Sequence, residues 1–257
     1  MCIMMVMYRM VQGFPIVLGA NRDEFYERCS HRPDCLSQTP AIWGGRDAQA
    51  GGTWLGVNEY GLVVGLTNRR LHEAYEPVAD RRSRGLLCLD ALRQRRASNV
   101  AELLASEPPD RYNAFNLLVF DSTTALWIAY DGKPEVCLLE PGMHILANKN
   151  LNDMETLRVR RAQHLLDAAG QVQLEDVLPC LARVCGDHEP GVQEREHLCL
   201  HRSDEMYGTV SSTILAISPQ RHKSIYYYAS GHPCRTAYQD YSAYLISPQK
   251  PSWTLPS

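Results

Sequence analysis

Cys2 directly follows the initiator methionine, and this position could make it a catalytic nucleophile. A small second residue generally permits removal of Met1, which would leave a thiol and a free α-amine on the same residue. Such a pair can act as a nucleophile with its own base. An α-amine has a pKa near ~8, so part of it is unprotonated at neutral pH. The alternative is that Cys2 is a small buried residue on the first strand.

A charged motif, Asn21-Arg22-Asp23-Glu24, follows the second apolar run of the chain. Residues 2–9 and 15–20 are both strand-like, which predicts a β-hairpin. Antiparallel pairing places the end of the second strand beside the start of the first, so the motif should lie near Cys2. Its guanidinium would favour a thiolate, and its carboxylate could orient the amine. Alternatively, the motif is a solvated loop with a surface ion pair.

Two other segments could line a pocket. In Gly51-Gly52-Thr53-Trp54-Leu55-Gly56 the glycines let backbone N–H groups approach a ligand, and the tryptophan could form an apolar wall. The alternative is a β-bulge beside a core tryptophan. The hydroxyl-rich segment Tyr207–Thr213 could line a polar pocket or satisfy backbone groups.

Asn148 follows a short apolar run and offers a side-chain amide. An amide N–H at such a point could donate a hydrogen bond to a developing oxyanion. The alternative is that the side chain caps a turn.

The predicted elements alternate between groups of strands and groups of helices, which favours one mixed domain over residues 1–257 with stacked sheets and outer helices. We expect the helix at 100–105 to begin with a capping box of Asn99 and Glu102, and the helix at 153–169 to be capped by Asn152 and Glu155 and ended by Gly170. Strands are expected at 2–9, 15–20, 54–58, 61–67, 115–121, 124–130, 143–147, 213–217 and 225–229, helices at 84–93, 100–105, 153–169 and 173–184, and irregular structure at 21–40, 186–207 and from 247 onward.

Composition narrows the classes of partner. The chain has 257 residues, of which 45% are hydrophobic and 21% charged, with a net charge of −3, so nucleic acid and anionic membrane surfaces are not expected partners. No run approaches the ~18 apolar residues of a membrane span, and no signal sequence is evident, so we expect a cytoplasmic protein. Nine irregularly spaced cysteines without a Cys-x-x-Cys pair predict neither a disulfide framework nor a zinc site.

These motifs, taken in order, resemble those of the NRDE family, also called the transport and Golgi organisation protein 2 family. The resemblance extends from Met1 to about Ala229. The motifs that carry it are Met1-Cys2, Asn21-Arg22-Asp23-Glu24, Gly51-Gly52-Thr53-Trp54-Leu55-Gly56, Leu66-Thr67-Asn68, Asn148, Gly208-Thr209 and Ser211-Ser212-Thr213.

The resemblance implies an α+β fold of the cysteine N-terminal-nucleophile hydrolase type: a four-layer α/β/β/α sandwich with mostly antiparallel sheets. It is similar to the penicillin V acylase and bile salt hydrolase group, in which the N-terminal cysteine attacks an amide carbonyl. The implied catalytic residues are Cys2, Arg22, Asp23 and Asn148, with Asn150 a nearby alternative to the last. The implied substrate-binding residues are Asn21, Gly52, Thr53, Trp54 and Asn68.

Val210 departs from the family pattern, which often has arginine there. If that arginine assists the nucleophile, Arg202 or Arg235 would have to replace it in this chain.

Three functions are compatible with these features. The first is amide hydrolysis or acyl transfer on a small substrate with an apolar acyl part, which needs no metal or organic cofactor. The second, also implied by the resemblance, is non-catalytic binding and trafficking of haem or of a lipid or acyl-CoA. The third is a redox-sensing thiol at Cys2 beside Arg22. No feature specifies an oligomeric state.

Overall fold

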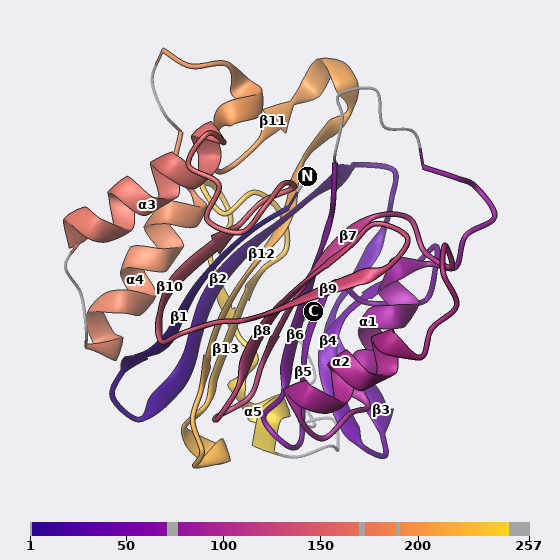
Figure 1. The fold of residues 1–257 in the computed structure, drawn as a ribbon. Coiled ribbons are helices and arrows are strands. Elements are labelled where there is room, and N and C mark those ends of the chain that lie inside the picture. Colours follow the sequence, from indigo (N-terminus) through magenta and orange to yellow (C-terminus); the bar gives the residue numbers. More distant parts are fainter. Residues whose placement is uncertain (1, 71–76, 170–172, 189–190, 247–257) are drawn as a thin grey trace, which may run out of the picture.

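The computed structural model describes residues 2–70, 77–169, 173–188 and 191–246. Two antiparallel sheets pack face to face, and each carries helices on its outer side (Figure 1). The first sheet has the order β10-β1-β2-β12-β13-β14, with β11 paired to β12, and the second follows the chain from β3 to β9. The first sheet comprises β1 (Ile3–Val11), β2 (Phe14–Phe25), β10 (Gly142–Leu146), β11 (His201–Arg202), β12 (Tyr207–Ile217), β13 (Ile225–Ala229) and β14 (Gln239–Asp240).

Helices complete a four-layer α/β/β/α sandwich, as the resemblance implies. Strands of the second sheet are β3 (Ser30–Gln38), β4 (Ala41–Asp47), β5 (Leu55–Asn58), β6 (Val63–Asn68), β7 (Phe115–Phe120), β8 (Ala125–Tyr130) and β9 (Pro134–Leu138). This sheet packs against α1 (Arg84–Leu92) and α2 (Ala97–Ala105), while the first packs against α3 (Leu157–Ala169) and α4 (Leu174–Cys185). A short helix, α5 (Ser242–Ile246), lies against β13.

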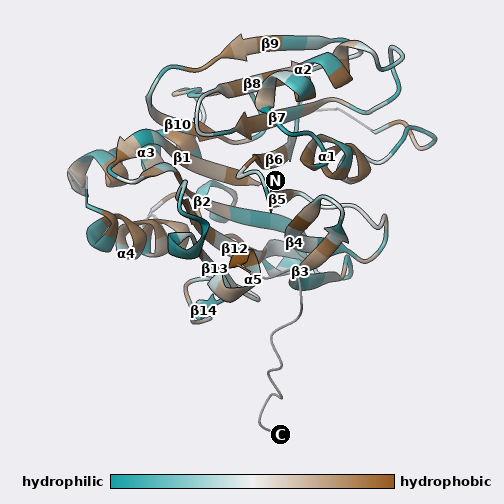
Figure 2. Cartoon of the chain, turned by 90° about the horizontal axis from the view of Figure 1, so that it is seen from below, coloured by the Kyte–Doolittle hydropathy of each residue, from teal (hydrophilic) through white to brown (hydrophobic). Residues whose placement is uncertain are grey.

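Strand β1 is buried on both faces, which explains the unbroken apolar run at the start of the chain. Its side chains alternate with the period of two that a strand imposes. Met4 and Val6 enter the core between the sheets, whereas Ile3 and Met5 enter the core beneath α3 and α4. Figure 2 shows hydrophobic residues along the central strands β1, β6 and β7. No helix of the described residues is long and apolar enough to cross a membrane.

The structure corrects the extent of β2, which was predicted to end at Ala20. It continues to Phe25, so the Asn21–Glu24 motif lies in the strand and not in a loop after it. The reason is a second partner: β12 also begins earlier than predicted and pairs with this end of β2, with Asp23 opposite Thr209.

Besides the two-residue strands β11 and β14, the sequence did not predict β3, β4 and β9. Two of them, β3 and β9, form the edges of the second sheet. An edge strand can be polar and can contain a proline, such as Pro33 in β3, because one of its sides needs no ladder partner. The polar stretch 21–40, which was predicted to be irregular, therefore contains β3 as well as the end of β2.

The two predicted helix caps are wrong. Helix α2 begins at Ala97, whose N–H donates to the Asp121 carboxylate, and Asn99 lies inside the helix. Helix α3 begins at Leu157, after a turn in which Thr156 donates to Asp153. Asn152 has a positive φ of 55° and accepts a hydrogen bond from Ile145 N–H instead of capping the helix. Gly170 and the tail from residue 247 lie outside the described residues.

Candidate functional site

Cys2 lies immediately before β1 and lines a cavity of about 570 Å³. The predicted antiparallel pairing of the first two strands is present, with Ile3 opposite Asn21. As expected from that pairing, Arg22 and Asp23 line the same cavity, although their side chains lie on opposite faces of the sheet. Thr53, Trp54 and Asn68 also line it.

The Cys2 thiol is held in its protonated form. Burial raises its pKa, and the negative charge of Asp23 adds to that effect. The backbone N–H of Asp23 and the positive charge of Arg22 oppose it, but the net direction is upward. The thiol therefore has to lose its proton to a base when it attacks a substrate. An α-amine on the same residue would be such a base.

Arg22 projects toward the second sheet and forms one wall of the cavity with Trp54. Its guanidinium carbon lies 4.5 Å from the centre of the indole ring, a cation–π contact. The arginine is only 5% exposed, and its other neighbours are the Ser30 hydroxyl at 3.5 Å and the Glu24 carboxylate at 3.9 Å. Stacking on an aromatic surface fixes the positive charge on the Cys2 side of the sheet.

Asp23 projects toward the helices on the other face of its sheet. Its carboxylate accepts a hydrogen bond from Arg158 of α3 at 2.8 Å and another from the Thr209 hydroxyl at 2.6 Å. Arg158 is 4% exposed, so this is a buried ion pair. Sequence reasoning missed Arg158. The available signal was its place on the buried stripe of α3, one turn before Ala162.

Gly52 and Thr53 hold the cavity wall against the start of α1. The Thr53 N–H donates to the Gly85 carbonyl at 3.0 Å, and the Thr53 hydroxyl donates to Gly45 O at 2.7 Å. A side chain at Gly52 would collide with the backbone of Gly85. Gly52, a predicted substrate contact, is not among the described lining residues and is placed to pack backbone against backbone.

The asparagines predicted for the site separate into two groups. Asn68 lines the cavity, and the Asn148 amide donates to the Asn68 carbonyl at 2.6 Å from behind it. Asn21 lies on the helix side and donates to Cys185 O and Leu198 O at 2.8 and 2.9 Å. Asn150 accepts from Arg69 at 2.8 Å. Of these four asparagines, only Asn68 is among the described residues that line the cavity.

The cavity is rich in arginine, which the sequence analysis did not anticipate. Arg22, Arg28, Arg81, Arg82 and Arg84 line it, against three carboxylates, those of Asp23, Glu24 and Asp47. A second cavity of about 690 Å³ shares part of this lining and adds Arg70. Among the described lining residues the arginines thus exceed the carboxylates by two, and Arg81 and Arg82 also pair with Asp110 and Asp90 outside the lining.

Arg28 and Asp47 form an ion pair of 2.7 Å at the cavity wall. Burial alone would raise the pKa of Asp47, but the hydrogen bond and charge of Arg28 lower it. Asp47 is therefore ionised at neutral pH and neutralises one of the arginines.

Neither proposed replacement for the arginine missing at Val210 is among the described residues that line these two cavities. Val210 itself lies at the β-bulge of β12 between Thr209 and Ser211. Arg202 pairs with Glu205, and the charge of Arg235 acts on a group of histidines that includes His201.

One protein family and members of it match the sequence of this chain. The family described as Transport and Golgi organisation 2 matches residues 1–228. The human Transport and Golgi organization protein 2 homolog is 28% identical over 240 residues, which cover 82% of this chain and 84% of that protein. The mouse Transport and Golgi organization 2 homolog is 35% identical over 144 residues, which cover 53% of this chain and 51%, about half, of that protein.

Solved structures that resemble this fold include hydrolases and an acylase. The C2A variant of the conjugated bile acid hydrolase from Clostridium perfringens superposes with a TM-score of 0.58 at 13% identity, covering 94% of this chain and 96% of that one. Penicillin V acylase from Agrobacterium tumefaciens gives 0.55 at 12% identity, covering 90% and 83%. The Caenorhabditis elegans orthologue of N-acylethanolamine-hydrolyzing acid amidase gives 0.54 at 15% identity, covering 84% and 92%.

Proposed function

Because the chain belongs to the Transport and Golgi organisation 2 family and has the fold of N-terminal-nucleophile hydrolases, we propose that it cleaves or transfers an acyl group at an amide C–N bond through Cys2. The observation that carries the proposal is the position of Cys2 at the cavity, at the start of β1 and beside the paired end of β2. Removal of Met1 would give this thiol an α-amine as its base. The structural neighbours named above include amide-cleaving enzymes, which supports the same chemistry.

The reaction proceeds through an acyl-thioester. The α-amine takes the thiol proton as sulfur attacks the carbonyl carbon, and the carbonyl electrons move onto oxygen. When the tetrahedral intermediate collapses, the C–N bond breaks and the ammonium returns its proton to the leaving nitrogen. Water, deprotonated by the same amine, then attacks the thioester and releases the carboxylic acid and the thiol. Transfer to another nucleophile in place of water would give acyl transfer.

Each neighbouring residue has a role in this scheme. Arg22 stabilises negative charge on sulfur, and Asp23, held by Arg158, orients the amine. The Asn68–Asn148 pair supplies the oxyanion donor, because Asn68 borders the cavity and Asn148 fixes its backbone. Because burial raises the pKa of the Cys2 thiol, the α-amine takes up the thiol proton as part of the attack.

The cavity favours a substrate with both an apolar and an anionic part. Trp54 offers the apolar surface, and five arginines against three carboxylates favour a carboxylate or phosphate on the substrate. The nine cysteines are all free, which supports a reducing, cytoplasmic setting for this chemistry.

A second candidate, binding and trafficking of an acyl-CoA or haem, is favoured by the same arginine lining, because arginines suit phosphates and propionates. No histidine is among the described residues that line either cavity, so a haem there would take its axial ligand from Cys2, Cys29 or Tyr207. Titration with acyl-CoA and with haem tests this candidate. Saturable micromolar binding by both the wild type and Cys2→Ala, without turnover, would favour the carrier.

The test of the enzyme compares Cys2→Ala and Cys2→Ser with wild type on a panel of N-acyl amides that carry a carboxylate or phosphate. Loss of the nucleophile is expected to reduce kcat/KM by about 10³-fold or more. Cys137→Ser, at an exposed cysteine of β9, is the matched control and should retain full activity. Undiminished activity in both Cys2 variants rejects Cys2 as the nucleophile.

A further inference from the structure

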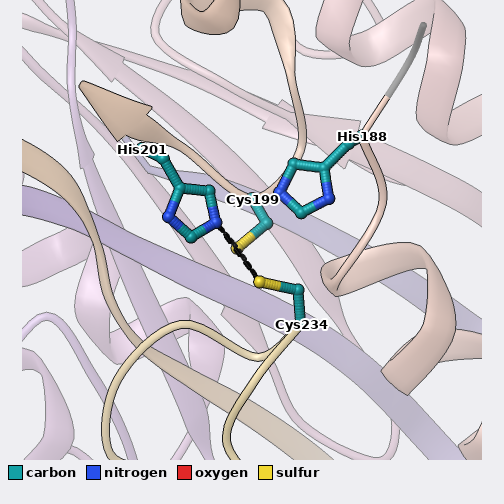
Figure 3. Close-up of side chains that lie close together, drawn as sticks. All are labelled: His188, Cys199, His201 and Cys234. Atoms are coloured by element: carbon teal, nitrogen blue, oxygen red, sulfur yellow. Dashed lines mark hydrogen bonds between the residues drawn. The ribbon is translucent and has the colours of Figure 1, made fainter. Parts of the chain in front are cut away.

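Four metal-binding side chains converge at one end of the first sheet: His188, Cys199, His201 and Cys234. His188 follows α4, Cys199 lies just before β11, His201 is the first residue of β11, and Cys234 follows β13. One ligand atom from each lies within 4.8 Å of all the others. Figure 3 shows the two sulfur atoms between the two imidazole rings. None of the four lines the cavity at Cys2 or the second cavity that overlaps it, so this is a separate site.

The distances among three of these ligands match a tetrahedral zinc ion. Zn–S bonds of about 2.3 Å and Zn–N bonds of about 2.0 Å separate two sulfurs by about 3.8 Å, and a sulfur and a nitrogen by about 3.5 Å. The Cys199 and Cys234 sulfurs are 3.7 Å apart. His201 Nε2 lies 3.5 Å from the Cys199 sulfur and 3.2 Å from the Cys234 sulfur. A disulfide would instead require sulfurs about 2.05 Å apart.

We propose that His188, Cys199, His201 and Cys234 bind a zinc ion. Two cysteines and two histidines are a donor set that zinc prefers, and four protein ligands leave no coordination position for a substrate. The site is therefore structural. Binding releases the two thiol protons and forms two Zn–S and two Zn–N bonds.

The surroundings suit such a site. Cys199 is buried, and its N–H donates to the Asp187 carbonyl at 3.1 Å, which ties it to the segment that carries His188. The ring of His232 packs against His201 with centroids 4.0 Å apart and limits its rotation. His188 and Cys234 are at the surface, so an ion can enter from solvent.

The zinc would connect to the candidate active site through the Leu198–Leu200 backbone. The Leu198 carbonyl accepts from Asn21 and from Arg158, and the Leu200 N–H donates to Thr209, whose hydroxyl donates to Asp23. Fixing Cys199 and His201 therefore also fixes the partners of Asp23. The sequence predicts no zinc site because the chain has no Cys-x-x-Cys pair. These four ligands are brought together only by the fold.

The first test is the metal content of the whole chain, purified without chelators and under reducing conditions. We expect about one zinc per chain that survives dialysis, with loss of most of that zinc in Cys199→Ser and Cys234→Ser and retention in Cys137→Ser. No stoichiometric zinc after reconstitution, zinc unaffected by both variants, or a Cys199–Cys234 disulfide with no zinc uptake after reduction would each overturn the proposal.

A second test does not depend on how the variants fold. Wild-type protein loaded with Co²⁺ in place of zinc should show thiolate-to-cobalt charge-transfer absorption and the strong d–d bands of tetrahedral cobalt. Weak octahedral d–d bands without a charge-transfer band would contradict the assignment, because they exclude two thiolate ligands.

Discussion

At the scale of single residues, the candidate site depends on charges that are placed on the two faces of β2. Arg22 stacks on Trp54 on the Cys2 side, while Asp23 is buried against Arg158 on the helix side. The alternation of a strand produces this division, since neighbouring residues point to opposite faces. Arg22 thus places a positive charge beside the thiol, and Asp23 anchors β2 to α3.

Arg158→Met tests the anchoring role. The substitution leaves the Asp23 carboxylate buried without its charged partner, and breaking a buried pair in this way costs about 3–5 kcal/mol. The loss is measured as a decrease in the free energy of unfolding in urea. Arg93→Ala, which removes an exposed pair with Asp90, is the control and should cost less than about 1 kcal/mol. Equal effects of the two substitutions would contradict the anchoring role.

At the scale of elements, the sequence predicts the apolar strands and the position of α1 well, because burial and a side-chain cap leave local signals. A helix was expected at 84–93, and the hydroxyl of Ser83, directly before α1, accepts from Gly85 N–H. Polar strands such as β3 leave no such signal. The same is true of a helix start whose backbone N–H donates to a residue far along the chain. The start of α2, for example, depends on Asp121 at the end of β7, far along the chain.

Gly52→Ala tests the contact between the cavity wall and α1. The added methyl would meet the backbone of Gly85, which cannot rotate away, so we expect a loss of about 1–3 kcal/mol of stability. In urea unfolding this appears as a lower midpoint with an unchanged slope. Gly186→Ala, whose methyl would meet its neighbours at ordinary distances of 3.4 Å or more, should stay within about 0.5 kcal/mol. A neutral Gly52→Ala would refute this account of the contact.

Asp121 gives the stability a dependence on pH. Burial would raise its pKa, but hydrogen bonds from Ala97, Thr123 and Thr124 lower it below its ordinary value. Its contribution is therefore full above the unfolded-state pKa of about 3.9 and is lost as the pH falls through the lower folded-state value. Asp121→Asn should reduce stability at neutral pH and flatten its decline below pH ~4. An acid profile identical to that of wild type, or an equal change in the exposed control Asp131→Asn, would contradict this role.

At the scale of the whole molecule, pairing rules predict part of the site and tertiary packing decides the rest. Cys2, Arg22 and Asp23 could be placed together from the expected hairpin alone, because their proximity follows from neighbouring strands. Arg158, the arginines before α1 and the four proposed zinc ligands could not, because each reaches its place through contacts between distant segments. The segment 186–207 shows this most clearly: a loop by its sequence, it carries three of the four ligands.

The central claim is that Cys2 becomes an N-terminal nucleophile. The most direct measurement is the intact mass of the purified chain before and after an electrophilic acylating probe, followed by peptide mapping. The account predicts a mass without Met1 and a single acyl adduct on Cys2, formed ahead of the other cysteines. A chain that retains Met1, or an adduct that forms first on another cysteine, would contradict it.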